Sequence, residues 1–304
     1  METGGDRSMN IFFTSQRIRT ALLMLAGLAF FIFLFGPVYW MIATSFMTES
    51  EMLTVPPHFI PHEPTIKNYM TIFGKGDPEY LKLAYNRAPA VFDIGPAMWN
   101  SMVTAISVAI INLFVATPAA YAIARLNVRA SLPVLMSYLV IRMFPPIMIV
   151  VPLFLVMRNL ELIDTRLSLV LVYCFFTIPF TIWILQSYFK AMPLELENAA
   201  LIDGCSRWQT VWYILLPLAR PGLICIVILA FMSSWSEFLF AVVFTKTAAS
   251  KTITVVAASF ADTAAVQFDY VMTAGVLTAL PPFILALFFQ RYIVGGLASG
   301  AVKG

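Results

Sequence analysis

Residues 20–40 read TALLMLAGLAFFIFLFGPVYW, and no charged side chain occurs from Thr20 to Thr48. A helix of about 20 apolar residues is long enough to cross a lipid bilayer. The apolar part of a secretory signal peptide is shorter, about 7–15 residues, and ends at a small-residue cleavage site. This stretch is longer and continues into Pro37-Val-Tyr-Trp40. It therefore predicts a retained first transmembrane helix near 20–46.

The rest of the chain repeats this pattern. Five further apolar segments lie near 96–124, 131–157, 167–189, 221–245 and 270–294. Across the 304 residues, 60% are hydrophobic, only 12% are charged and the mean hydropathy is +0.85, against about 45–50% apolar and about 25% charged residues in soluble domains. These values exclude a soluble globular protein. They predict an all-α integral membrane protein with six transmembrane helices in residues 20–304, preceded by a tail, 1–19.

The positions of Lys and Arg predict the orientation of these helices. Placing the N-terminus in the cytoplasm puts ten Lys and Arg residues on the cytoplasmic side and eight outside, four of them in one long loop where the rule weakens. We therefore expect both termini to be cytoplasmic, with residues 47–95 forming an outer, periplasmic loop. The formal net charge of +3 comes with no basic run, so nucleic acid is not expected as a partner.

The outer loop contains both histidines of the chain, His58 and His62. It also contains six prolines, at positions 56, 57, 61, 64, 78 and 89, which predict a largely irregular segment. Because a regular helix cannot form around the histidines, their i,i+4 spacing does not indicate a metal site, and we expect solvated loop histidines. The three cysteines have no paired spacing and predict neither a metal site nor a disulfide.

The loop between the fourth and fifth apolar segments, about 190–220, has the most specific pattern. Pro193 can begin a short helix that Gly204 ends in a left-handed turn. Ser206 can cap a second helix. In that helix Trp208, Val211, Trp212 and Leu215 form one apolar stripe. On periodicity alone, an amphipathic helix lying on the bilayer surface remains an alternative.

The sequence of this loop resembles the signature of the integral-membrane subunits of binding-protein-dependent ABC importers. That signature is Glu-Ala-Ala, three residues, Gly, nine residues, then Ile-x-Leu-Pro. Here the chain reads Asn198-Ala-Ala-Leu-Ile-Asp-Gly204, then nine residues, then Ile214-Leu-Leu-Pro217, so every gap matches. One departure is that the signature Glu falls on Asn198, with an acidic residue displaced to Glu197.

Other stretches resemble the carbohydrate-specific branch, the relatives of the second maltose-type permease subunit. They are Asn100-Ser101, Ala120-Tyr-Ala-Ile-Ala-Arg125, Met143-Phe-Pro-Pro146, Ser234-Trp-Ser-Glu-Phe238 and the ending Gln290 to Gly304. The resemblance implies a type I ABC importer permease fold in the bacterial inner membrane. It further implies a second permease subunit, an ATPase dimer and a periplasmic solute-binding protein as partners, and a sugar-like solute.

The resemblance also assigns roles within the loop. Residues 195–217 are expected to couple to the ATPase, and the residues carrying this role are Glu197, Asn198, Ala199, Ala200, Asp203, Gly204, Trp208 and Pro217. The charge contact is assigned to Glu197 or Asp203, or replaced by an amide hydrogen bond. The chain lacks a G-x-x-x-x-G-K-[ST] phosphate-binding loop. It is therefore expected to bind no cofactor and to be no enzyme, with ATP and Mg²⁺ used by the partner ATPase.

Two charged residues fall inside predicted spans, where charge is costly and commonly functional. Arg142 and Glu237 lie at depths that differ by roughly 6 Å at ~1.5 Å per residue, so they can pair. They predict part of a solute path, with Asn112 and Trp235 as hydrogen-bonding and stacking partners for a sugar. A structural role, as a buried brace between spans or as a charge held by the partner permease, is an alternative at least as strong. A secondary transporter is the alternative function, although the halves of the chain show no internal repeat.

Overall fold

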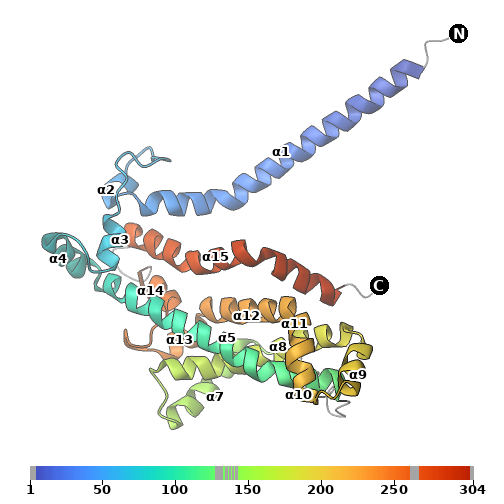
Figure 1. Ribbon diagram of the computed structural model, residues 1–304. Helices are drawn as coiled ribbons and strands as arrows, with labels where there is room; N and C mark the ends of the chain where they lie inside the picture. Colours follow the sequence, from blue (N-terminus) through green and yellow to red (C-terminus); the bar gives the residue numbers. More distant parts are fainter. Residues whose placement is uncertain are drawn as a thin grey trace. The chain divides into compact units, whose positions relative to one another are not determined.

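The computed structural model (Figure 1) describes residues 5–126, 143–260 and 267–301, together with positions 133, 136, 138 and 140. Side chains are described within these ranges for residues 19–290. The described residues form helices and connecting turns, with no strand among them. This agrees with the predicted all-α class.

The chain divides into two compact units, residues 1–69 with 267–276, and residues 70–266 with 277–304. In the first unit, helix α1 runs from Gly5 to Ser45, and its apolar side chains between Leu22 and Phe35 are exposed, as suits contact with lipid. The end of α1 is held by polar contacts. Asn68 donates to the carbonyls of Ser45 and Met47 at 3.2 and 2.9 Å. The short α2 (Glu49–Met52) follows it.

The second unit is built around α5 (Ile94–Arg125), which packs along α8 (Arg166–Ala191) and α12 (Arg220–Trp235). Figure 1 shows these three helices side by side. Gly222 allows α12 to approach α8 closely, because a Cβ there would lie 2.8 Å from the Tyr188 ring. Around this centre lie α7 (Pro146–Asn159), α13 (Leu239–Phe244) and α14 (Ile253–Ser259). The last helix, α15 (Phe268–Ala301), has residues in both units.

Four described helices are long and apolar enough to cross a membrane, and a bent pair makes five if it counts as one span. The four are Arg19–Ser45, Pro89–Arg125, Arg166–Ala191 and Phe268–Gln290. In the predicted third span, 131–157, the first twelve positions are described only at residues 133, 136, 138 and 140, and the continuous helix α7 begins at Pro146. The count of six spans and the cytoplasmic position of both termini therefore stay predictions.

The fifth predicted span, 221–245, is not one continuous helix. The helix stops at Trp235 and restarts at Leu239, so α12 and α13 are separated by three non-helical residues. On its other side, the segment Arg207–Leu218 meets α12 at a bend of 78°. The physical reason for the break lies at Glu237, whose carboxylate accepts the backbone N–H groups of Phe240 and Ala241 at the start of α13. Because these N–H groups are hydrogen-bonded, a helix can begin here within an apolar segment.

The expectation that loop 47–95 is largely irregular is also wrong for its second half. That half contains α3 (Lys67–Ile72), α4 (Pro78–Arg87) and the 3₁₀ helix η1 (Pro89–Asp93). Pro78 and Pro89 occupy first helical positions, where the missing N–H costs nothing. Asp77 caps α4 by accepting the N–H of Glu79 at 3.0 Å. Prolines that were expected to break helices here begin them.

Candidate functional site: a coupling loop and a pocket in the spans

The loop at 190–220 folds into the two helices that its sequence predicts. Helix α9 spans Leu194–Ile202, and Gly204 follows it with φ of +88°. Ser206 caps the next helix, α10 (Arg207–Thr210), in a reciprocal capping box with Gln209. The helix continues through the π-helical turn η2 (Val211–Leu215) into α11 (Leu216–Leu218), which contains Pro217. The predicted positive φ at Gly204 and the predicted cap at Ser206 are confirmed.

Glu197 is the buried acid of this loop. It is 6% exposed, and its Oε1 accepts a hydrogen bond of 2.6 Å from the hydroxyl of Tyr121 on α5. Its Oε2 lies 3.5 Å from Nε of Arg125, four residues further along α5. Arg125 also donates to the carbonyl of Met192 at 2.7 Å, just before α9 begins. Glu197 therefore fastens α9 to the end of the α5 span and does not face outward.

The other residues assigned to coupling divide between the two faces of this helix pair. Ala200 is buried against the unit. The outward surface of the pair contains Asn198, Ala199, Asp203, Gly204, Trp208 and Pro217. Trp208 and Trp212 are 65% and 57% exposed although Val211 and Leu215 of the same stripe are buried. The loop thus presents small and polar groups beside two indole rings.

The two indoles border an apolar hollow of about 500 Å³. Its walls come from α5, from the α10–α11 segment and from the start of α12, and include Phe114, Pro118 and Leu223. Large aromatic side chains that border a hollow are common anchors in protein–protein interfaces. This geometry suits a loop that receives another protein surface.

Glu237 lines a second hollow, of about 290 Å³, at the break between α12 and α13. Besides the two backbone N–H groups of α13, its carboxylate accepts a hydrogen bond of 2.7 Å from the hydroxyl of Tyr173 on α8. Phe144, Phe176, Phe180 and Ser233 are among the other lining residues. A carboxylate and hydroxyls among aromatic rings can bind a polar solute through hydrogen bonds and stacking.

Asn112 and Trp235, the other predicted path residues that the structure describes, do not line this hollow. Asn112 is fully buried, donates to Val108 and Thr177 at 2.8 Å and accepts from Thr181 at 2.9 Å. Trp235 is 1% exposed and donates from Nε1 to the carbonyl of Thr278 at 2.9 Å. Both side chains thus use their polar atoms within the chain. Arg142 lies outside the described residues, so its pairing with Glu237 stays a prediction.

Asp164 joins two connecting loops. It lies at one end of α5 and α8, and the loop at 190–220, here called the coupling loop, lies at the other end. One carboxylate oxygen accepts the N–H groups of Lys246 and Thr247 at 2.7 and 3.0 Å and the hydroxyl of Ser250, and the other accepts the Thr247 hydroxyl at 2.8 Å. Burial acts to raise the pKa of Asp164, but these hydrogen bonds outweigh it and hold the pKa well below its ordinary value. The carboxylate is therefore ionised throughout the physiological pH range.

Sequence reasoning missed Tyr121, Arg125, Tyr173 and Asp164. Tyr121 and Arg125 are separated by four residues on one helix, so a shared face was predictable. Their partner Glu197 is 76 residues from Tyr121 in the chain, so no local sequence pattern predicts that contact. Both residues do fall within the stretch 120–125 that carries the family resemblance, which was the available signal.

Comparisons with known proteins agree with the geometry. The trehalose/maltose transport system permease protein MalG of Thermococcus litoralis is 33% identical over 94% of this chain and 98% of its own length. The sulfoquinovosyl glycerol transport system permease protein SmoH of Agrobacterium fabrum is 32% identical over 97% of each chain. The diacetylchitobiose uptake system permease protein DasC of Streptomyces coelicolor is 28% identical over 94% of this chain and 95% of its own length.

The fold is also similar to that of a solved transporter. A chain in the crystal structure of a bacterial ABC transporter involved in the import of the acidic polysaccharide alginate matches with a TM-score of 0.74 and 21% identity. The match covers 91% of this chain and 97% of that one. At this level of identity the likeness supports the fold.

A family description matches the chain over residues 112–298, which include the Tyr121–Glu197 contact, the coupling loop and the Glu237 hollow. That family consists of transport components located in the inner membrane, not of enzymes. The match covers more than half of the chain, and relatives above 30% identity extend over nearly all of it. The chain is therefore an inner-membrane permease that belongs to the family of binding-protein-dependent transport system inner membrane components.

Proposed function

We propose that this chain is one permease subunit of an ATP-driven importer for a sugar or sugar-like solute. The names of its relatives, which transport trehalose and maltose, sulfoquinovosyl glycerol and diacetylchitobiose, support the solute class. A second permease subunit completes the translocation path. Two ATPase subunits, which use ATP and Mg²⁺, and a periplasmic solute-binding protein complete the transporter.

The hollow beside Glu237 is our proposed contribution of this subunit to the solute path. Its volume of about 290 Å³ and its mixture of a carboxylate, hydroxyls and aromatic rings suit part of a small saccharide. Arg142 stays in this proposal as the candidate counter-charge. Asn112 and Trp235 would then act behind the lining, where they hold α5 to α8 and α12 to α15.

The coupling loop is the proposed receiver of ATPase motion. Asn198, Ala199, Asp203 and Gly204 offer a small, polar surface, and Trp208 offers anchoring area. The observation that carries this assignment is the attachment of Glu197 to Tyr121 and Arg125. Because α9 is tied to the end of α5 through buried polar contacts, a displacement of the loop moves the span with it. Glu197 is therefore a positioning residue, and direct contact with the ATPase is assigned to the charge of Asp203 or to an amide hydrogen bond from Asn198.

The test is ATP-dependent uptake by the complete transporter in proteoliposomes, with the binding protein and a panel of labelled sugars. Glu197→Gln keeps the shape of the side chain but weakens the buried contacts with Tyr121 and Arg125. We expect this variant to assemble and to hydrolyse ATP, while uptake of solute falls at least tenfold. Glu195→Gln is the matched control, since Glu195 lies on the same helix and is exposed.

Two results would contradict the proposal. Normal uptake by Glu197→Gln would remove its positioning role. Uptake driven by an ion gradient without ATP would instead identify a secondary transporter and overturn the ATP-driven mechanism itself.

A further inference from the structure

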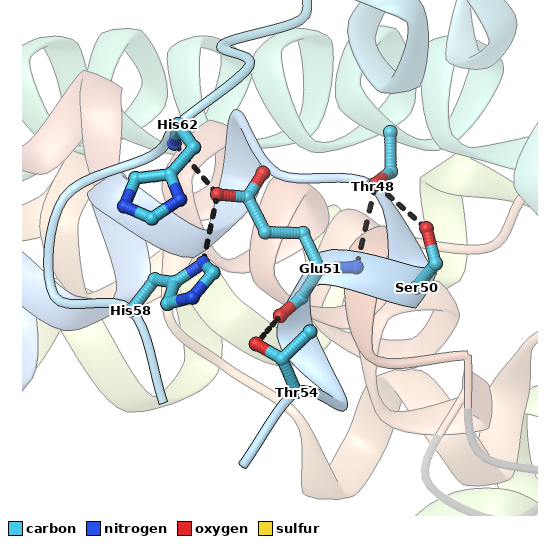
Figure 2. A network of polar contacts seen from close by, with 6 residues as sticks. All are labelled: Thr48, Ser50, Glu51, Thr54, His58 and His62. Carbon is cyan, nitrogen blue, oxygen red and sulfur yellow. Dashed lines mark hydrogen bonds and ion pairs between the residues drawn. The ribbon is translucent and has the colours of Figure 1, made fainter. Parts of the chain in front are cut away.

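Three metal-binding side chains meet in the outer loop, in a part of the chain that the proposed function does not use. They are Glu51 of α2 and the two histidines of the following proline-rich segment, His58 and His62 (Figure 2). The sequence predicted solvated loop histidines. In the structure the His58 side chain is 28% exposed, and the two imidazole rings lie 3.9 Å apart between centroids.

The distances between the three residues are short enough for shared coordination. Glu51 Oε1 lies 3.5 Å from Nδ1 of His58 and accepts the backbone N–H of His62 at 2.6 Å. One ligand atom from each of the three side chains lies within 4.8 Å of the other two. Ligands about 2.1 Å from a tetrahedral metal ion lie roughly 3.4 Å apart. Side-chain movements of about 1 Å would therefore close the set around an ion.

His58 supplies a separate reason to expect a cation. Its Nδ1 atom is buried and has no hydrogen-bond partner, although it faces the carboxylate of Glu51. This nitrogen can face the carboxylate oxygen favourably either as the N–H of the neutral ring or with a metal ion bound between the two atoms. An N–H at Nδ1 would account for His58 and Glu51 but not for His62. A shared metal ion accounts for all three side chains, because it also gives a ligand role to the imidazole of His62, whose ring centroid lies 3.9 Å from that of His58.

The backbone around the site is held by contacts that do not need an ion. Thr48 caps α2 by accepting the N–H of Glu51 at 3.4 Å, and the Thr54 hydroxyl donates to the Glu51 carbonyl at 2.7 Å. Between the two histidines, Phe59 packs its ring against Trp40 of α1 and accepts the Tyr39 hydroxyl at 3.0 Å through its carbonyl. Both ligand-bearing segments are thus positioned in advance, which favours metal affinity.

We propose that Glu51, His58 and His62 bind one divalent transition-metal ion on the outer side of the membrane. Two imidazoles and one carboxylate form a donor set that suits Zn²⁺, with water as a fourth ligand. The ion would join α2 to residues 58–62 and stiffen the loop that leaves the first span.

Equilibrium binding to the full-length chain in detergent tests this proposal, with Zn²⁺ as the probe. The protein should carry a tag without histidine and be stripped with a chelator before titration. We expect one equivalent of Zn²⁺ to bind, and at least tenfold weaker binding by His58→Gln, His62→Gln and Glu51→Gln. Glu63→Gln is the matched control, because Glu63 is an exposed acid directly after His62. It should bind as the parent does.

A second measurement separates coordination from misfolding. Phe59 is 69% exposed and offers a chymotrypsin site inside the metal-bridged segment. Zn²⁺ should slow cleavage there at least fivefold in the parent and in Glu63→Gln, but not in His58→Gln. Circular dichroism of each variant verifies that the helices are retained. Absence of stoichiometric binding by the parent, or unchanged binding by the His58→Gln/His62→Gln double variant, would overturn the site.

Discussion

Asp164 shows how much one side chain can organise at the surface of this permease. It adopts φ of +63°, a left-handed conformation that Asp and Asn tolerate better than other non-glycine residues. From there its carboxylate receives four hydrogen bonds from residues 246–250. Its own N–H donates to the carbonyl of Phe244 at 2.8 Å. The carboxylate therefore sets the conformation of the loop that follows α13.

We expect Asp164→Asn to lower the free energy of unfolding by about 1–2 kcal/mol, because charge-assisted hydrogen bonds are replaced by weaker ones and one amide group faces donors. Thermal unfolding in detergent can be followed by maleimide labelling of the buried Cys174 and Cys225, after replacement of the more accessible Cys205. Glu161→Gln is the control, since Glu161 lies in the same turn with a similar φ of +58°. An equal effect of both changes would contradict a specific role for the carboxylate.

The difference in stability between the parent protein and Asp164→Asn should also depend on pH. The folded pKa of Asp164 is depressed, so its stabilisation is present above the unfolded value of about 3.9 and is lost as the pH falls toward the folded pKa. The difference in stability between the parent and Asp164→Asn should stay constant from pH 8 to about pH 5. It should shrink only below about pH 4.

At the residue scale, what the sequence predicted depended on local geometry. Gly204 and Ser206 were assigned correctly because a left-handed turn and a helix cap each involve a few neighbouring residues. The direction of Glu197 was not predictable. It depends on which face of α9 meets α5, and that contact joins residues far apart in the chain. The grouping of Glu51 with the histidines was missed for a similar reason, because the carboxylate comes from before the proline-rich segment.

At the scale of elements, hydropathy predicts where helices cross a membrane but not where they break. The segment 221–245 is apolar enough to form one continuous helix. From the sequence alone, Glu237 is expected to pair with a charged residue of another span. In the structure the carboxylate instead caps α13 across a three-residue interruption. The outer loop shows the reverse case, since Pro78 and Pro89 begin helices because they fall at first positions. Both errors arise because hydropathy and residue type do not encode hydrogen-bond partners.

The break between α12 and α13 carries a prediction about the solute path. Glu237→Gln should assemble with its partners but reduce ATP-dependent uptake at least tenfold and alter the preference among sugars, because the acceptor lining the hollow loses its charge. Ser236→Ala is the control, as the exposed Ser236 hydroxyl donates to the Met232 carbonyl and Ser236 does not line the hollow. Uptake is measured in proteoliposomes.

Because Glu237→Gln also weakens the cap of α13, a second variant keeps the prediction decisive. Ser233 lies on the hollow, and Ser233→Phe fills it without touching the contacts of Glu237. Loss of uptake in both variants supports a path through this hollow. Normal uptake by Ser233→Phe in an assembled transporter would exclude it.

At the scale of the second compact unit, α5 has a buried or part-buried polar attachment near each of its ends. At one end Tyr121 and Arg125 hold the coupling loop through Glu197. At the other end Asn100 donates to the carbonyls of Ala248 and Lys251, each at 3.0 Å, and the Ser101 hydroxyl accepts the N–H of Ile253 at 2.9 Å. From residue 100 to residue 125 an α-helix extends roughly 38 Å. One helix therefore links the loop at 190–220 to the loop after α13, which the predicted orientation places on opposite sides of the membrane.

This arrangement predicts that ATP changes the exposure of the outer loop. The reporter is Ala249→Cys in a Cys205→Ser background, because Ala249 is exposed between the two carbonyls that Asn100 binds. In the assembled transporter, ATP should change the rate of maleimide labelling at position 249 at least threefold. Asn86→Cys on α4, which is exposed and apart from these attachments, should show no change.

Variants that break the attachments at the two ends of α5 should change the labelling of position 249 in different ways. Glu197→Gln releases the coupling end, so labelling at position 249 should stay at its ATP-free rate whether or not ATP is present. Asn100→Ala releases the outer end, so labelling should be fast in both states, since the loop no longer follows the helix. Combining the two changes should reproduce the Asn100→Ala result, because the outer attachment acts after the coupling attachment. If ATP still changes the labelling of position 249 in the Glu197→Gln variant, the signal reaches the outer loop by another route and α5 is not the connecting element.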